Sequence, residues 1–98
     1  MDRQVKWTQR VQTQIDTTFD YIAGNLSVQG AINFIQKVYE QENRLSKHPE
    51  SGKFSAKSRN IRYILLGRHR RLYYRFSDRL VTVLALFDTR QDPRKQPF

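Results

Sequence analysis

The sequence predicts an α+β domain in which a helical hairpin packs on one face of a twisted antiparallel β-sheet. Two observations carry this prediction. Apolar residues recur at three- and four-residue spacing through residues 8–48, as they do in amphipathic helices. Residues 59–90 then form three strand-like runs that are separated by turn signals. A chain of 98 residues can bury one core, so we expect a single domain over residues 1–98.

The first expected elements are a short strand and a helix. Val5 and Trp7 would share one face of the strand. Thr8 suits a helix N-cap, because its hydroxyl can accept a hydrogen bond from an unpaired backbone amide. Gly24-Asn25 should end the helix, since both residue types tolerate a left-handed C-terminal cap. The expected apolar stripe is Val11, Ile15, Phe19, Ile22 and Leu26.

A second helix follows with its own start and stop signals. Ser27 is the expected N-cap, and Pro49 marks the end because proline cannot continue the hydrogen-bond ladder. A connection of about two residues makes the two helices antiparallel neighbours. The expected apolar stripe is Val28, Ala31, Ile32, Ile35, Val38, Tyr39 and Leu45, with Phe34 at its margin.

The remaining residues predict a loop, three strands and an irregular tail. Residues 47–58 lack periodicity and are expected to form a loop. Turns at Gly67 and at Ser77-Asp78 would make the strands an antiparallel meander. Residues 80–87 are apolar on both faces, which indicates a central strand. On the strand before it, alternation places Leu72, Tyr74 and Phe76 on one face and Arg71, Tyr73 and Arg75 on the other.

Charge separates the two halves of the chain. Residues 1–46 hold five basic and five acidic side chains, so the whole net charge of +9 comes from residue 47 onward. This asymmetry predicts an anionic partner for the C-terminal half, either nucleic acid or an acidic protein. The absence of cysteine excludes disulfides and thiolate metal sites. No apolar run suits a signal peptide or a membrane span, so we expect a cytoplasmic protein without membrane contact.

The candidate chemistry is a set of arginines with interleaved tyrosines. No glycine-rich phosphate loop or zinc spacing occurs, so no cofactor and no metal are expected. Arginine binds phosphate through a planar fork, and tyrosine can stack on an unpaired base, so the set could hold RNA and stabilise a pentavalent phosphate. The alternative is a solvated face whose arginines pair with carboxylates. The expected basic face is Arg62, Arg68, Arg70, Arg71, Tyr73, Arg75 and Arg90, with His69 as a possible general base or a turn residue without function.

The order of these elements resembles the RelE/ParE superfamily of bacterial toxins. The matching stretches are Trp7-Thr8, residues 19–27, Leu45 with Pro49 and Gly52, residues 70–76, and residues 87–93. The resemblance implies a toxin of a type II toxin–antitoxin module that is held inactive by a cognate antitoxin. RelE-like members cut ribosome-bound mRNA without a metal, whereas ParE-like members bind DNA gyrase and need no catalytic group.

Residue by residue, the resemblance divides between these two activities. Arg62, Arg71 and Arg90 fall at basic positions of the RelE-like nucleases. A further basic position of the nucleases is Ile64 here, and the tail offers Phe98 in place of their C-terminal tyrosine. We therefore expect a ParE-like toxin that binds an essential target such as DNA gyrase. The alternatives are a RelE-like mRNA endoribonuclease that uses these arginines with His69, and a non-catalytic nucleic-acid-binding module.

Overall fold

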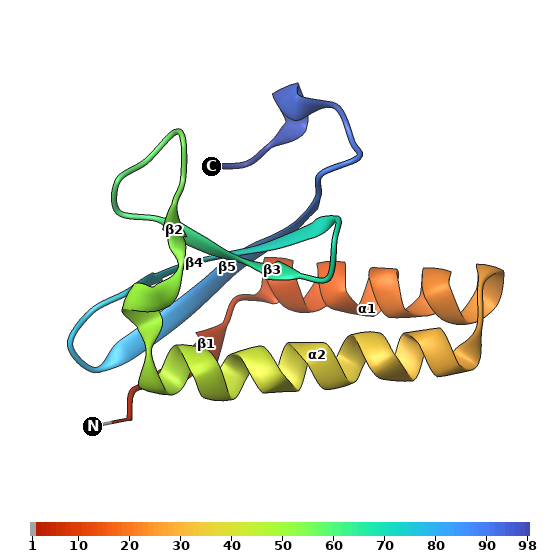
Figure 1. Ribbon diagram of the computed structural model, residues 1–98, viewed down its shortest axis with the longest axis horizontal. Helices are drawn as coiled ribbons and strands as arrows, with labels where there is room; N and C mark the ends of the chain where they lie inside the picture. Colours follow the sequence, from red (N-terminus) through yellow and green to blue (C-terminus); the bar gives the residue numbers. More distant parts are fainter. Residues whose placement is uncertain (1) are drawn as a thin grey trace.

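The computed structural model describes residues 2–98, and it contains two antiparallel helices beneath one five-stranded sheet (Figure 1). This arrangement confirms the predicted fold class. The helical hairpin extends past the end of the sheet (Figure 1). No helix within residues 2–98 combines the length and the apolarity that a membrane crossing requires. The elements are β1 (Gln4–Trp7), α1 (Gln9–Asn25), α2 (Val28–Lys47), η1 (Pro49–Ser51), β2 (Lys53–Phe54), β3 (Arg62–Leu66), β4 (Arg70–Phe76), β5 (Leu80–Asp88) and η2 (Pro93–Lys95).

The sheet has the order β1-β5-β4-β3-β2. Strands β3, β4 and β5 form the predicted antiparallel meander, and β5 lies between two neighbours as expected of a central strand. Strand β1 pairs with β5 in parallel, because the helical hairpin separates it from the meander in the chain. The predicted loop over residues 47–58 is corrected in part, since Pro49–Ser51 forms a 3-10 helix and Lys53–Phe54 pairs with β3.

Both predicted N-caps are present. Thr8 Oγ1 accepts from the Val11 amide at 3.3 Å, and Ser27 Oγ accepts from the Gly30 amide at 2.9 Å. The left-handed C-terminal cap expected at Gly24-Asn25 is not present, because α1 runs through Asn25 and Gly67 alone among residues 2–98 has a positive φ.

The apolar stripes also differ in detail. Leu26 is 71% exposed because it lies in the tip of the hairpin, and the prediction that it joins the core is wrong. Phe34, expected at the margin, is only 5% exposed and packs in the core. The buried side of α2 is Ala31, Phe34, Val38 and Leu45.

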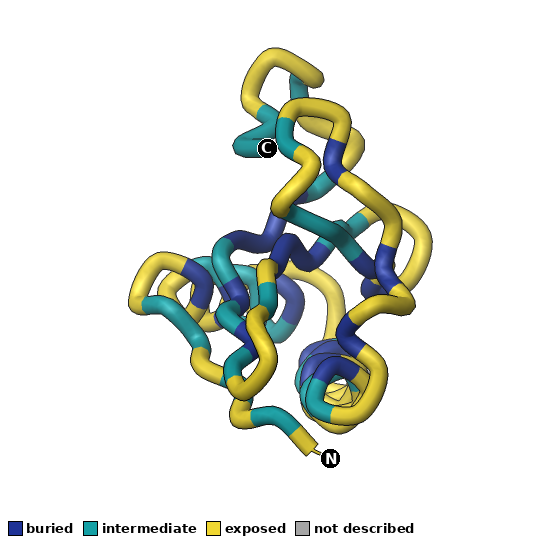
Figure 2. The backbone as a smooth tube through the Cα atoms, turned by 90° about the vertical axis from the view of Figure 1, so that its left-hand side faces the viewer, coloured by how far each residue is buried: buried dark blue, intermediate teal, exposed yellow. Residues whose placement is uncertain are grey.

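The sheet has an inner face toward the helices and an outer face away from them. Leu72 and Tyr74 are fully buried in the core with Val81 and Val83, as the predicted alternation requires. A register shift between Tyr73 and Tyr74 leaves Leu84 of β5 without a partner in β4. Figure 2 shows the buried residues gathered where helices and sheet face one another, with exposed residues in the turns.

A buried hydroxyl fastens the loop after α2 to the sheet. Tyr74 Oη donates to the carbonyl of Pro49 at 2.5 Å and accepts from the amide of Gly52 at 3.0 Å. A Cβ atom on Gly52 would lie 2.2 Å from this hydroxyl, so only glycine allows the approach. Burial raises the pKa of Tyr74 above its ordinary value of 10.0. The hydroxyl is therefore neutral, and its two hydrogen bonds hold the loop against the sheet.

Candidate functional site

The predicted basic residues do not share one face of the sheet. Arg62 lies opposite Tyr74 and therefore on the inner face, and Arg70 places its guanidinium 5.4 Å from the ring of Phe34 on α2. Arg71 points outward, over the ring of Tyr63 at 4.4 Å. The expectation of one continuous arginine face is wrong, because alternation along β4 places Arg70 with Leu72 and Tyr74, and the pairing of Arg62 with Tyr74 places Arg62 on that inner face as well.

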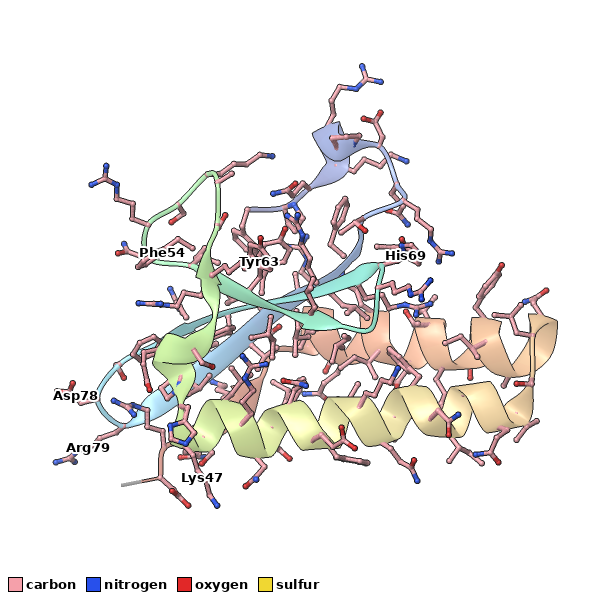
Figure 3. The ribbon with its side chains drawn as sticks, in the orientation of Figure 1. Lys47, Phe54, Tyr63, His69, Asp78 and Arg79 are labelled. Atoms are coloured by element: carbon pink, nitrogen blue, oxygen red, sulfur yellow. The ribbon has the colours of Figure 1, made fainter. Side chains whose placement is uncertain are left out.

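The outer face is covered in part by the chain's own C-terminus. The ring of Tyr73 lies between Tyr63 at 5.8 Å and Phe98 at 5.6 Å, and the residue is fully buried. Lys57 Nζ donates to the carbonyl of Gln96 at 2.6 Å and holds the tail in this position. Figure 3 shows Tyr63 beneath the C-terminal segment. Tyr73 therefore offers no open ring for base stacking, which corrects its predicted role.

Arg71 lies beside this aromatic cluster and is only partly exposed. Its Nη1 is 3.5 Å from the hydroxyl of Tyr73, which is a long contact. Its Nε is buried and donates to none of the residues that the structure describes. Arg75, two positions beyond Tyr73 along β4, is exposed opposite Thr82.

The guanidinium of Arg62 is hydrogen-bonded to the loop that precedes it in the chain. Its Nη1 donates to the carbonyls of Glu50 at 2.8 Å and Gly52 at 3.0 Å. Its guanidinium also lies 4.1 Å from the centre of the Phe54 ring, which Figure 3 shows at the edge of the sheet. Ile64 on the same strand is 3% exposed in the core, so this position presents no polar group to solvent. In this part of β3 both side chains serve the fold.

The end of the meander carries two further candidates. Arg90 binds the carboxylate of Asp88 through Nε at 3.1 Å and Nη2 at 2.7 Å. These hydrogen bonds lower the pKa of Asp88 from 3.8 to about 2. His69 lies exposed in the turn between β3 and β4 (Figure 3), beside the exposed Arg68. The carbonyl of His69 accepts from the Thr89 amide at 2.6 Å, which ties this turn to the end of β5.

A basic groove of about 540 Å³ lies between α1 and the end of β5. Four basic side chains line it together with one carboxylate, that of Asp88. They come from α1, from the start of β4 and from the tail, and they are Arg10, Arg70, Arg90 and Lys95.

The sequence analysis assigned Arg70 and Arg90 to a sheet face and missed the α1 side of this groove. A signal was present, because polar residues recur on α1 at helical spacing opposite its apolar stripe. They are Arg10, Thr13, Gln14, Thr17, Thr18 and Tyr21. No group of three or more His, Cys, Asp or Glu side chains within residues 2–98 is arranged to hold a metal ion.

Three comparisons with known proteins complete this description. A family model described as "ParE toxin of type II toxin-antitoxin system, parDE" matches residues 5–93. No curated protein sequence matches the chain. Among solved structures, a chain of the chromosomal ParDE TA system from P. aeruginosa superimposes with a TM-score of 0.73 at 18% identity, covering 88% of this chain and 95% of that chain.

Two more structures share the fold at lower identity. A YoeB/ParE toxin from Agrobacterium tumefaciens has a TM-score of 0.64 at 11% identity, covering 87% of this chain and 96% of its own. A YoeB dimer from Staphylococcus aureus gives a TM-score of 0.61 at 9% identity, covering 87% and 94%.

Proposed function

This chain belongs to the ParE toxin family of type II toxin–antitoxin systems, and from that premise we propose that it arrests growth by binding an essential target such as DNA gyrase. A cognate antitoxin neutralises it in this proposal. The competing activity, cleavage of ribosome-bound mRNA, requires several side chains to act on one phosphate.

The observation that carries the proposal is that each of the three candidate arginines is held by different partners. Arg62 is held by the carbonyls of Glu50 and Gly52, and Arg90 is paired with Asp88. Arg71 packs on the outer face of the sheet against Tyr63. Acid–base and electrostatic catalysis need groups that converge on the reacting atoms. Because the three arginines have different partners, the arrangement favours binding of a target over cleavage of RNA.

The proposed contacts with the target come from basic side chains that the fold leaves exposed. Arg68 and Arg75 are exposed, and neither forms a salt bridge within residues 2–98. Arg71 and Arg90 are the partly engaged members of the same set. A distributed positive surface steers an acidic partner and tolerates the loss of one side chain better than a catalytic centre does.

A paired assay tests the target. Purified protein is added to a DNA gyrase supercoiling reaction and, separately, to a translation extract whose mRNA is then analysed for cuts. We expect inhibited supercoiling and intact mRNA, and the variants Arg71→Ala and Arg90→Ala should each retain much of the inhibition. Cleaved mRNA that becomes intact with Arg71→Ala would overturn the proposal in favour of the nuclease. Intact mRNA with unimpaired supercoiling would remove gyrase as the target.

The proposed antitoxin is tested by genetics. Expression of this chain alone should stop growth, and co-expression of the small protein encoded beside it should restore growth. Purification through a tag on one protein should recover both. A growing culture that expresses the intact chain by itself would contradict the toxin proposal at this first step.

A further inference from the structure

Helix α2 carries a second apolar stripe that the sheet does not cover. Its members recur at spacings of four, three and four residues, which places them on one side of a helix. We call them the outer stripe, and they are Val28, Ile32, Ile35 and Tyr39. At 3.6 residues per turn they lie about a quarter turn from the buried stripe of α2. The sequence predicted all four for the core, but three are exposed and Ile35 is half-buried.

The two ends of the outer stripe differ in shape. At the tip of the hairpin, Leu26 lies two residues before Val28 and is exposed to solvent. At the other end, Tyr39 lines a hollow of about 320 Å³ together with Val5 of β1. A two-fold axis brings each end of one copy to the opposite end of the next. A face with an exposed apolar side chain at one end and a hollow at the other can therefore pack against a copy of itself.

The distribution of charge also favours a second copy as the partner of this stripe. Residues 21–36 contain no charged side chain, although 28% of the whole chain is charged. Figure 1 shows this part of the hairpin extending past the end of the sheet. The net charge of +9 comes from residue 47 onward, so two copies repel each other least where residues 21–36 meet. A nucleic acid or a strongly charged protein would find no opposite charge there.

An antiparallel pair of α2 helices gives each residue of the outer stripe an apolar counterpart. With the two-fold axis between residues 33 and 34, Val28 of one copy lies opposite Tyr39 of the other, and Ile32 lies opposite Ile35. The charged residues of α2 begin only at Lys37, so no like charges meet in this register. The same register places Leu26 of one copy beside the hollow at Tyr39 of the other.

We propose that the outer stripe joins two copies of this chain into a two-fold dimer, in which the α2 helices lie antiparallel and Leu26 of each copy enters the hollow beside Tyr39 of the other. The sheet packs on the buried stripe of α2 and stays outside the interface. The contact covers one helix face and a hairpin tip, so we expect a dissociation constant on the order of 10 µM. The inference concerns the chain by itself and does not depend on its cellular target.

Sedimentation equilibrium of the full-length chain, from about 1 to 200 µM, tests the dimer. The apparent mass should rise with concentration from that of one chain toward that of two. Ile32→Glu places two carboxylates in the interface and should weaken association at least about tenfold. Leu65→Glu is the matched control, because Leu65 is an exposed apolar residue of β3 outside the hairpin, and it should associate like the native chain. Circular dichroism and the midpoint of urea unfolding check that both variants fold.

Crosslinking tests the register, and the absence of native cysteine makes each introduced thiol specific. Chains carrying Val28→Cys are mixed with mass-tagged chains carrying Tyr39→Cys and treated with a thiol crosslinker that spans about 8 Å. The mixture should give a crosslinked heterodimer. Each variant alone should give at least about fivefold less product, because identical positions lie about 16 Å apart along antiparallel helices. Leu65→Cys mixed with Val28→Cys is the control and should give no product above background.

Several results would overturn the inference. A mass of one chain throughout the concentration range would exclude the dimer, and equal weakening by Ile32→Glu and Leu65→Glu would place the contact elsewhere. Equal crosslinking by either cysteine variant alone would exclude the antiparallel register. A monomeric chain whose outer stripe shifts in NMR spectra only when the protein encoded beside it is added would assign this stripe to that protein. A gyrase supercoiling assay is independent of all these readouts, so the proposed function can fail while the dimer stands, and the reverse.

Discussion

The two ends of the sheet use the same residue types for different purposes. At one end all five strands meet, and Arg62 gives its guanidinium to the carbonyls of Glu50 and Gly52. At the other end β1 and β2 are absent, and Arg90 holds only the carboxylate of Asp88 at the surface. The backbone carbonyls bound by Arg62 belong to a packed loop and cannot move away from it. The surface carboxylate bound by Arg90 can be replaced by a carboxylate of another molecule. An arginine at the first end therefore builds the fold, whereas one at the second end can recognise a partner.

Gly52→Ala should have the largest effect, because it acts where the first end is most tightly packed. The new Cβ would lie 2.2 Å from Tyr74 Oη and 2.9 Å from the carbonyl of Tyr63. Neither group can move freely, so we expect a loss of about 3 kcal/mol in the free energy of unfolding, measured by urea denaturation.

Gly24→Ala is the matched control for that substitution. A Cβ on Gly24 meets no atom within 4 Å apart from its chain neighbours and the adjacent backbone of α1, in which the residue lies. Alanine favours a helix over glycine, so this variant should be stable or gain about 0.5–1 kcal/mol. Equal destabilisation by both substitutions would show that the close approach at Gly52 does not govern the stability of this end.

Tyr74→Phe should have the second largest effect. It removes the hydroxyl that joins Pro49 to Gly52 and leaves both backbone groups buried without that partner. The expected loss is about 2 kcal/mol in the free energy of unfolding. Tyr73→Phe is the control at the adjacent position, where the hydroxyl has one long contact with Arg71. It should cost less than half as much, and the reverse order would contradict the assignment.

Those adjacent tyrosines show how far the sequence could predict the fold. Alternation along β4 correctly placed Tyr74 inward, because a strand with one apolar face has few other ways to pack. The same alternation placed Tyr73 outward but could not show that Phe98 covers it. Contacts between residues distant in the chain depend on where the tail returns, and no local pattern encodes that. Phe34 was misjudged for a similar reason, since the sheet packed on α2 decides which stripe is buried.

The candidate site was less predictable than the fold. The excess of positive charge was correctly placed in the C-terminal half. The sequence could not distinguish Arg62, which is hydrogen-bonded to a loop, from Arg90, which stays at the surface. Arg10 and Gln14 joined the groove only through the packing of α1 beside β5. Residues on a helix and on a strand can be assigned to one site only after the register of the sheet is known.

Thr8→Ala should have an intermediate effect, because Thr8 stands where β1 ends and leaves the rest of that edge of β5 without a strand. Its hydroxyl caps α1 and also donates to the Leu84 carbonyl at 3.3 Å. The expected loss is about 1 kcal/mol in the free energy of unfolding. Ser27→Ala removes a cap without a second bond to the sheet and should cost less. Hydrogen exchange at Leu86 should accelerate in Thr8→Ala only, and unchanged exchange would show that the cap does not support this edge.

Acid titration should give the smallest effect and should arise at the open end. The pKa of Asp88 is lowered to about 2, first by its hydrogen bonds from Arg90 and further by the charge of Arg70. A carboxylate with a lowered folded-state pKa stabilises the fold above its ordinary pKa, near 4, and loses that contribution as the pH falls toward 2. Solvent screens this surface pair, so its contribution to the unfolding free energy is small.

Asp88→Asn isolates the contribution of that carboxylate. The difference in unfolding free energy between the native chain and the variant should be constant from about pH 7 to pH 5 and should shrink between about pH 4 and pH 2. Tyr74 at the other end has a raised pKa, so it stays neutral throughout and adds no dependence in this range. A difference that persists unchanged at about pH 2 would mean that the substituted amide disturbs packing. The pair of Asp88 with Arg90 would then not be the exchangeable contact that distinguishes the two ends.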